Sequence, residues 1–182
     1  MGWWDLIKDG KLITAICPGT YDPVTNGHLD IIARAAGIFD RVVVGVVRDP
    51  QHKQAMFTVE ERVDFLRGAL DGHDNVEVEV FAELVVEFAR RWGAKTMVKG
   101  LRAISDFEWE FQMHHLNRNL APDIETLYLM SSPQYGFLSS SGVKEVASFG
   151  GNVEDLVPQP VARRFQEKFP RAKPGAPLSP QE

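Results

Sequence analysis

Short apolar runs alternate with amphipathic segments along most of the chain, and this alternation predicts an α/β fold. The run RVVVGVV is continuous and β-branched, which is typical of a strand buried on both faces. We expect strands at residues 12–17, 41–47, 76–81, 96–98 and 124–130, and helices at 27–39, 58–70, 83–92, 105–120, 139–149 and 161–169. Because the two kinds of element alternate, the strands should be parallel and joined by right-handed crossovers. Ligands of such a sheet bind outside the carboxyl ends of its strands.

Two of the expected helices open with a capping-box sequence. Glu61 follows Thr58, and Glu108 follows Ser105, at the three-residue spacing at which each side chain can bond the other residue's backbone N–H. We therefore expect Thr58 and Ser105 to be the N-caps of their helices.

The composition is that of one globular domain. Of 182 residues, 44% are hydrophobic and 25% are charged, which excludes disorder of the whole chain. We divide the chain into an N-terminal extension (1–11), one domain (12–169) and a proline-rich tail (170–182). The tail has almost no large apolar residue, so we expect it to be disordered.

Charge, hydropathy and cysteine content argue against several partners. No run approaches the ~18 apolar residues of a membrane-spanning helix. The net charge of −5 argues against nucleic acid as a partner. Cys17 is the only cysteine, so no internal disulfide can form, and we see no signal-peptide pattern. We expect a cytoplasmic protein without a membrane partner.

The loop after the first expected strand carries the strongest candidate chemistry. Its sequence, PGTYDPVTNGH (18–28), combines glycines with a helix start near Asn26, where free N–H groups favour an anion. His28 would lie in the first helical turn and could donate a hydrogen bond to a phosphate. A lone histidine there is more often a surface or structurally satisfied residue. The glycines and the strand-end position favour the functional interpretation.

Three further strand-end loops carry anion-binding features. Lys99 and Arg102 flank Gly100 directly after an apolar strand, where the alternative is a solvated pair of cations. The serines of LSSS (138–141) open a helix, as phosphate ligands or as plain N-caps. The loop 48–53 supplies another cation. The convergence of these loops is a stronger signal than any one of them.

Competing motifs are absent from the sequence. It has no P-loop, GxGxxG, CxxC or HExxH pattern, and no cluster of carboxylates suggests a metal site built by the protein. His114 and His115 are about 100° apart on a helix and cannot share one metal from one face. We interpret them as structural or interface residues.

Three separated blocks resemble a known enzyme family. TNGH (25–28) resembles the HxGH signature of the nucleotidyltransferase superfamily, with Thr25 in place of its first histidine. LSSSGVK (138–144) resembles the superfamily's ISSTxxR motif, with Lys144 at its end. PGTYDPVTNGHLD, KGLRAISDFEWE and FLSSSGVKEVA are similar to bacterial phosphopantetheine adenylyltransferases, and the resemblance runs from about Leu12 to Phe169.

This resemblance implies a fold, an activity and partners. The fold would be a Rossmann-like parallel five-stranded sheet with helices on both faces. The enzyme would transfer the adenylyl group of ATP to 4′-phosphopantetheine, giving dephospho-CoA and pyrophosphate in coenzyme A biosynthesis. Mg²⁺ would be held mainly by the ATP phosphates. The resemblance also implies a homohexamer and makes coenzyme A a candidate feedback ligand.

The resemblance also assigns residues to each ligand. His28 would be the catalytic residue and stabilise the transition state. The ATP-binding residues would be Thr20, Tyr21, His28, Gly100, Leu101, Arg102, Glu110, Tyr135, Gly136, Phe137, Leu138, Ser139, Ser140 and Ser141. The residues that bind phosphopantetheine would be Thr20, Lys53, Val85 and Lys99. The loop around Lys53 is one residue longer than the family's common form, so His52 could take its role. Lys99 stands where many members carry arginine.

The implied chemistry agrees with these residue types. The nucleophile would be a substrate phosphate that is already ionised at neutral pH, so no general base is needed. Cations, helix N-termini and backbone N–H groups can position two anions and stabilise the charge on the attacked phosphate. Two other interpretations remain. One is a related nucleotidyltransferase with another acceptor, such as nicotinate mononucleotide or a phosphorylated polyol. The other is a non-catalytic sensor of a nucleotide or of coenzyme A.

Overall fold

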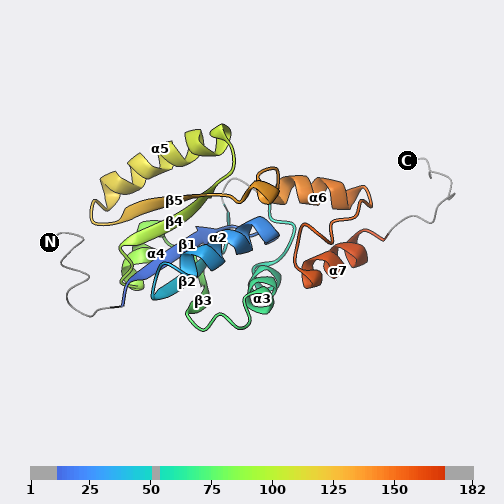
Figure 1. The fold of residues 1–182 in the computed structure, drawn as a ribbon, viewed down its shortest axis with the longest axis horizontal. Coiled ribbons are helices and arrows are strands. Elements are labelled where there is room, and N and C mark those ends of the chain that lie inside the picture. The colour runs from blue at the N-terminus through green and yellow to red at the C-terminus, as the bar shows by residue number, and fades with distance from the viewer. Residues whose placement is uncertain (1–11, 51–53, 171–182) are drawn as a thin grey trace.

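The centre of the molecule is a parallel sheet of five strands (Figure 1), seen in a computed structural model that describes residues 12–50 and 54–170. The strands are β1 (Thr14–Gly19), β2 (Arg41–Val47), β3 (Val76–Phe81), β4 (Thr96–Leu101) and β5 (Glu125–Met130). Their order is β3-β2-β1-β4-β5, and every neighbouring pair is parallel. The chain thus runs outward from β1 to β3, crosses back to β4, and runs outward again to β5. The predicted Rossmann-like α/β fold is confirmed.

Helices cover both faces of this sheet, as predicted. In the described ranges they are α2 (Asn26–Ala36), α3 (Val59–Ala69), α4 (Val85–Arg91), α5 (Ile104–Leu120), α6 (Ser140–Ser148) and α7 (Gln159–Lys168), with a 3-10 turn η1 (Pro133–Tyr135). The side chains of β2 show the two layers. Val42 and Val44 pack with α2 and α3, whereas Val43 packs with Phe88 of α4 on the opposite face. Because both faces are buried, the strand is continuously apolar.

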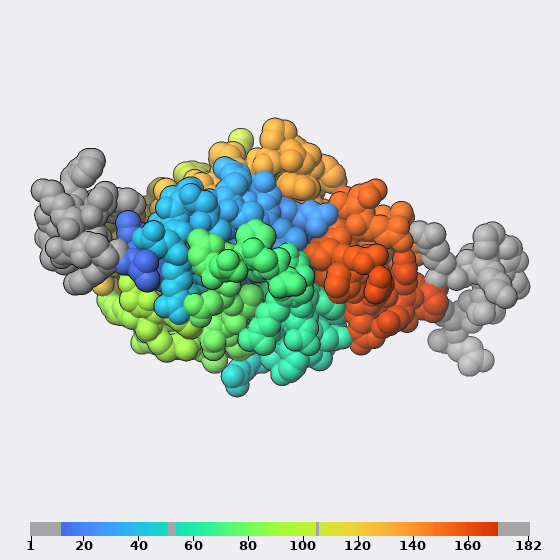
Figure 2. All heavy atoms as spheres, turned by 60° about the horizontal axis from the view of Figure 1, so that its bottom comes forward, coloured from blue at the N-terminus to red at the C-terminus, as the bar shows by residue number. Residues whose placement is uncertain are grey.

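The last two helices extend the molecule at one end. In Figure 2, α7 (red) adjoins the part of the surface that α3 provides, and α6 packs against α7. Val161 and Phe165 of α7 are buried in the same cluster as Phe57, and the Phe57 and Phe165 rings meet edge to face with centroids 5.2 Å apart. This end therefore belongs to the same core as the α2–α3 face of the sheet.

One predicted capping box is confirmed and the other is wrong. Thr58 caps α3: its Oγ accepts the N–H of Glu61 and its N–H donates to the Glu61 carboxylate. Helix α5 instead begins at Ile104, one residue before the predicted start, with Ala103 as the N-cap and no side-chain cap bond. The reason is local. The carboxylate of Asp106 accepts the N–H of Arg102 at 3.1 Å, which stabilises the earlier start.

Several boundaries differ modestly from those expected. Strand β4 continues past the predicted end at Val98 to Leu101, because Lys99, Gly100 and Leu101 pair in register with Tyr128–Met130 of β5. The first helix ends at Ala36 rather than Phe39. His52, Lys53, the N-terminal extension and residues 171–182 of the tail lie outside the described residues. None of the helices in the described ranges combines the length and apolar character of a transmembrane segment.

Candidate active site

A cleft in the described chain lies at the carboxyl ends of β1 and β4, in the middle of the sheet. Its volume is about 480 Å³. The strand order reverses direction between β1 and β4, and in open α/β sheets ligands bind at this switch point. The loop after β1, the end of β4, helix α5 and the start of α6 all contribute to its walls. The structure therefore has a cleft at the carboxyl ends of the strands, where the sequence analysis expects the ligands to bind.

Most of the residues proposed from the sequence meet in this cleft. Those that line it are Thr20, Tyr21, His28, Lys99, Gly100, Arg102, Glu110, Tyr135, Leu138, Ser139, Ser140 and Ser141. Four others are not among its lining residues: Val85, Leu101, Gly136 and Phe137. Leu101 is buried in the core and Val85 packs against the cluster under α4, whereas Phe137 is 73% exposed. The structure thus brings together residues that are more than 100 positions apart in the sequence.

Gly100 allows β4 to approach helix α2 closely. A Cβ atom at this position would lie 2.9 Å from Cγ1 of Ile31, which is shorter than a normal contact. Ile31 and Gly100 both line the cleft. A side chain at position 100 would push the two elements apart at the floor of the site, so the glycine here has a steric reason.

His28 is held by a reciprocal capping box at the start of α2. Its Nδ1 accepts the backbone N–H of Thr25 at 3.0 Å, and the Thr25 Oγ accepts the N–H of His28 at 3.4 Å. Because Nδ1 is an acceptor, the ring proton of the neutral imidazole is on Nε2. The ring of Tyr21 meets the imidazole edge to face, with centroids 5.2 Å apart. The imidazole therefore has a defined tautomer and orientation before any ligand binds.

The charge state of His28 follows from its surroundings. Burial, and then the positive charge of Arg102, lower the pKa of His28 from 6.5 to about 4. Both effects disfavour the cationic imidazolium. At neutral pH, His28 is therefore a neutral hydrogen-bond donor through Nε2.

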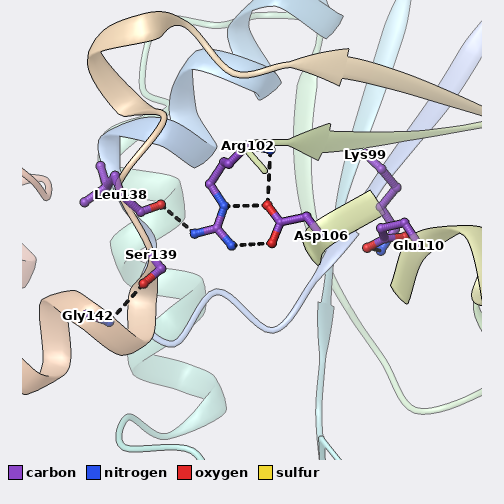
Figure 3. A network of polar contacts seen from close by, with 7 residues as sticks. All are labelled: Lys99, Arg102, Asp106, Glu110, Leu138, Ser139 and Gly142. Carbon is purple, nitrogen blue, oxygen red and sulfur yellow. Dashed lines mark hydrogen bonds and ion pairs between the residues drawn. The ribbon is translucent and has the colours of Figure 1, made fainter. Parts of the chain in front are cut away.

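Arg102 is fixed by two elements at once (Figure 3). Its Nε and Nη2 donate to the two carboxylate oxygens of Asp106 at 2.9 and 2.8 Å, and its Nη1 donates to the Leu138 carbonyl at 2.7 Å. Burial alone would raise the pKa of Asp106, but the hydrogen bonds and charge of Arg102 lower it overall. These bonds use three of the five guanidinium N–H groups. The remaining two can bind an anion without breaking the pair.

Lys99 has a carboxylate partner on α5, the helix that also carries Asp106. Its ammonium lies 3.3 Å from the Glu110 carboxylate, one helical turn after Asp106 (Figure 3). Asp106 and Glu110 of α5 therefore face the two cations at the end of β4 and its following loop. Sequence reasoning did not identify Asp106, although its spacing of four residues from Glu110 places both on one helix face.

The serines at the start of α6 have structural bonds as well as a place in the cleft. Ser139 is the N-cap, and its hydroxyl accepts the N–H of Gly142 at 3.0 Å. The Ser140 hydroxyl donates to the Pro23 carbonyl at 2.9 Å, which ties α6 to the loop after β1. The capping interpretation thus holds for Ser139. It does not exclude ligand binding, because the residues that begin this helix line the cleft, and a helix start favours an anion.

Three further polar residues escaped the sequence analysis as functional candidates: two that line the cleft and one that lines a second cavity at the end of β2. Asp22 and Lys144 both line the cleft and form an ion pair of 2.6 Å. Arg62 is 1% exposed and donates to the carbonyls of Thr20, Val47 and Arg48, all beyond the ends of β1 and β2 or at those ends. Lys144 could have been found from the motif that it ends. Asp22 and Arg62 have partners up to 122 residues away, and no local pattern indicates those contacts.

The sequence matches known proteins over most of its length. Residues 16–146 match the cytidylyltransferase-like family. The chain is similar to proteins named phosphopantetheine adenylyltransferase from three bacteria. It is 53% identical to the one from Symbiobacterium thermophilum (90% of this chain, 100% of that protein) and 51% to the one from Desulforudis audaxviator (85% and 94%). It is 49% identical to the one from Caldanaerobacter subterraneus (87% and 98%). The chain belongs to the phosphopantetheine adenylyltransferase family, within the cytidylyltransferase-like nucleotidyltransferases.

Proposed function

We propose that this chain transfers the adenylyl group of ATP to 4′-phosphopantetheine, giving dephospho-CoA and pyrophosphate. The observation that carries this proposal is the central cleft, where a neutral, oriented His28 faces the same space as Arg102, Lys99 and Lys144. The names of the relatives supply the acceptor. A cleft lined by cations and helix starts suits two substrates that both carry phosphates.

The reaction needs positioning and charge stabilisation rather than a base. A phosphate oxygen of 4′-phosphopantetheine attacks the α-phosphorus of ATP, a new P–O bond forms, and the bond to the bridging β-phosphate oxygen breaks. Pyrophosphate leaves with the bonding electron pair. As the α-phosphate gains charge, the Nε2–H of His28 donates to one of its non-bridging oxygens. Arg102, with two N–H groups left, binds nucleotide phosphate.

Lys99 is proposed to bind the acceptor phosphate from the end of β4. Its charge is balanced by Glu110 at 3.3 Å, a distance at the weak end for a hydrogen bond. The Arg102–Asp106 pair is shorter and bidentate. Lys99 is therefore the more easily displaced cation, which suits a group that must reach for a second substrate.

Mg²⁺ is the proposed cofactor, bound through the ATP phosphates. Three carboxylates at the cleft each have a cationic partner: Asp22 with Lys144, Asp106 with Arg102 and Glu110 with Lys99. In the described ranges no group of three metal-ligating side chains is assembled. The donor set therefore fits an ion whose main ligands come from the nucleotide. When bound, Mg²⁺ neutralises phosphate charge.

The proposed assembly is a homohexamer. Support comes from helix α5, which carries exposed large apolar side chains along much of its length: Ile104, Phe107, Phe111, Leu116 and Leu120. Apolar surface of this kind usually marks a contact with another protein. Light scattering of the purified chain measures the assembly directly.

Coenzyme A is the proposed feedback ligand, and the cytoplasm the proposed location. Coenzyme A differs from dephospho-CoA by one phosphate, so it can occupy the same cleft as the product. The single cysteine, Cys17, is buried and unpaired, which is consistent with a reducing compartment.

The test is turnover with defined substrates. The purified chain is incubated with ATP, Mg²⁺ and 4′-phosphopantetheine, pyrophosphate release is followed, and dephospho-CoA is identified by its mass. Parallel reactions use nicotinate mononucleotide or a phosphorylated polyol as the acceptor. Turnover with one of these alone would identify a related transferase. Tight ATP binding without pyrophosphate release from any acceptor would indicate a sensor.

A further inference from the structure

The Asp22 carboxylate lies in the wall of the cleft and has partners in two other segments of the chain. It is 5% exposed, and its Oδ2 lies 2.6 Å from the Lys144 ammonium. Its oxygens also accept the backbone N–H groups of Met56 at 3.0 Å and of Phe57 at 2.8 Å. One side chain thus joins the loop after β1, the segment before α3, and helix α6.

The first of these contacts fixes a cation at the nucleotide side of the cleft. Lys144 comes from α6 one turn after Ser140 and Ser141, and its side chain is only 19% exposed. A lysine side chain loses considerable rotamer freedom when it is immobilised. Because the pair with Asp22 already immobilises Lys144 in the folded protein, this rotamer entropy is not lost again when ATP binds.

The second contact fixes the wall between the cleft and its neighbour. Met56 and Phe57 line another cavity of about 490 Å³ at the end of β2, the strand next to β1. Phe57 is 2% exposed and packs against Phe65 and Phe165 in the core. The two backbone N–H groups therefore connect Asp22, and through it Lys144, to a rigid part of the molecule.

We propose that Asp22 is a positioning residue for the transfer reaction: it holds Lys144 at the ATP phosphates and, through Met56 and Phe57, fixes the wall beside it. This inference rests on the proposed function for the identity of the nucleotide. It assigns no chemical step to Asp22, which is an acceptor for three donors and has no role toward the reacting atoms.

The experiment is a double-mutant cycle on this pair. Asp22→Asn keeps an oxygen for the two backbone N–H groups but removes the charge that holds Lys144, and Lys144→Met removes the ammonium. We expect each single variant to raise the KM and Kd for ATP about tenfold, with the acceptor KM changed less than twofold. The double variant should be no worse than Lys144→Met alone, since the effect of Asp22 passes through Lys144.

Matched variants separate positioning from general damage. Asp123→Asn breaks a 2.9 Å ion pair with Arg90 outside the cleft and should leave all constants unchanged. Asp22→Ala also deprives Met56 and Phe57 of their acceptor, so it should lower the melting temperature further than Asp22→Asn. The Asn variant remains informative if the Ala variant does not fold.

Three outcomes would overturn the proposal. If the effects of the two substitutions on the ATP Kd multiply in the double variant, Asp22 does not act through Lys144. A lower melting temperature with unchanged ATP constants would reduce Asp22 to a structural role. Tighter ATP binding by Asp22→Asn would show that Asp22 competes with phosphate for Lys144. The ATP Kd is measured without an acceptor, so the double-mutant cycle gives a result whether or not the wild-type protein makes dephospho-CoA. A wild-type protein that binds ATP but makes no dephospho-CoA would refute the proposed function and leave the role of Asp22 to be decided by the cycle.

Discussion

Replacement of His28 by alanine tests the catalytic assignment most directly. The imidazole is neutral at pH 7, its proton is on Nε2, and its ring is held by Thr25 and Tyr21. A donor that is already oriented requires no rearrangement when charge develops on the α-phosphate, so it favours the transition state over bound ATP. We expect the loss to appear in kcat rather than in the Kd for ATP.

The magnitude follows from the number of interactions removed. Loss of one preorganised donor to a developing oxyanion typically costs about 10²–10³ in kcat, or roughly 3–4 kcal/mol. The alanine variant also loses the acceptor for the Thr25 N–H and hence half of the capping box, which costs about 1 kcal/mol of stability. The second effect belongs to folding and has to be separated from the first.

Glutamine at position 28 makes this separation. It is a usual capping-box residue, and its side-chain oxygen can accept the Thr25 N–H. We expect His28→Gln to melt near the wild-type temperature while kcat stays well below the wild-type value. His73→Ala, in the turn before β3, is the control for loss of an imidazole elsewhere.

The assay combines steady-state kinetics of pyrophosphate release with calorimetric titration of ATP. Near-normal kcat in His28→Ala would refute the reasoning. So would a loss that lies entirely in the ATP Kd, because it would place the hydrogen bond in the ground state.

Three further predictions concern the charges around the site. Lys99→Ala should chiefly weaken phosphopantetheine binding and Arg102→Ala chiefly ATP binding; equal losses for both ligands in separate titrations would contradict this division. The folded pKa of His28 lies below its ordinary value, so its contribution to stability is complete above pH 6.5 and is lost as the pH falls toward about 4. Urea unfolding at pH 5 and 7.5 should therefore show a larger difference for wild type than for His28→Gln. Arg62→Met should cost about 3 kcal/mol of unfolding free energy, because it leaves three partly buried carbonyls without their donor; a loss below about 1 kcal/mol would show that water replaces the guanidinium.

The sheet could be predicted from the sequence because its signals are local. A buried parallel strand such as β2 needs apolar side chains on both faces, and that requirement is visible in RVVVGVV. The Thr58 cap was equally readable, since both partners lie within one helical turn. The Ser105 cap failed because Asp106, in the same turn, accepts the backbone N–H of Arg102, three residues before Ser105, and two competing local signals cannot be ranked without the geometry.

The hydrogen bonds and ion pairs of the site could not be predicted because their partners are far apart in the sequence. Spacing alone says nothing of a pair such as Asp22 and Lys144, 122 residues apart. The charge of His28 cannot be derived from the sequence for a different reason. A helix start disfavours the imidazolium and a phosphate favours it, so the balance depends on burial and on Arg102, which only the folded chain reveals.

The central strands also set the mechanics of the molecule. In the described chain β1 pairs with β4 at two positions, Ala15 with Thr96 and Ile16 with Met97, and the paired register ends there. The sheet thus consists of a three-stranded half and a two-stranded half. The short β1–β4 pairing joins the two halves, and they separate beside the cleft. A ligand held by Thr20 on one side and Arg102 on the other bridges the halves where backbone pairing has ended. If the two halves move relative to each other, we expect such a ligand to restrain that motion, and amide hydrogen exchange in β1 and β4 with and without ATP would measure it.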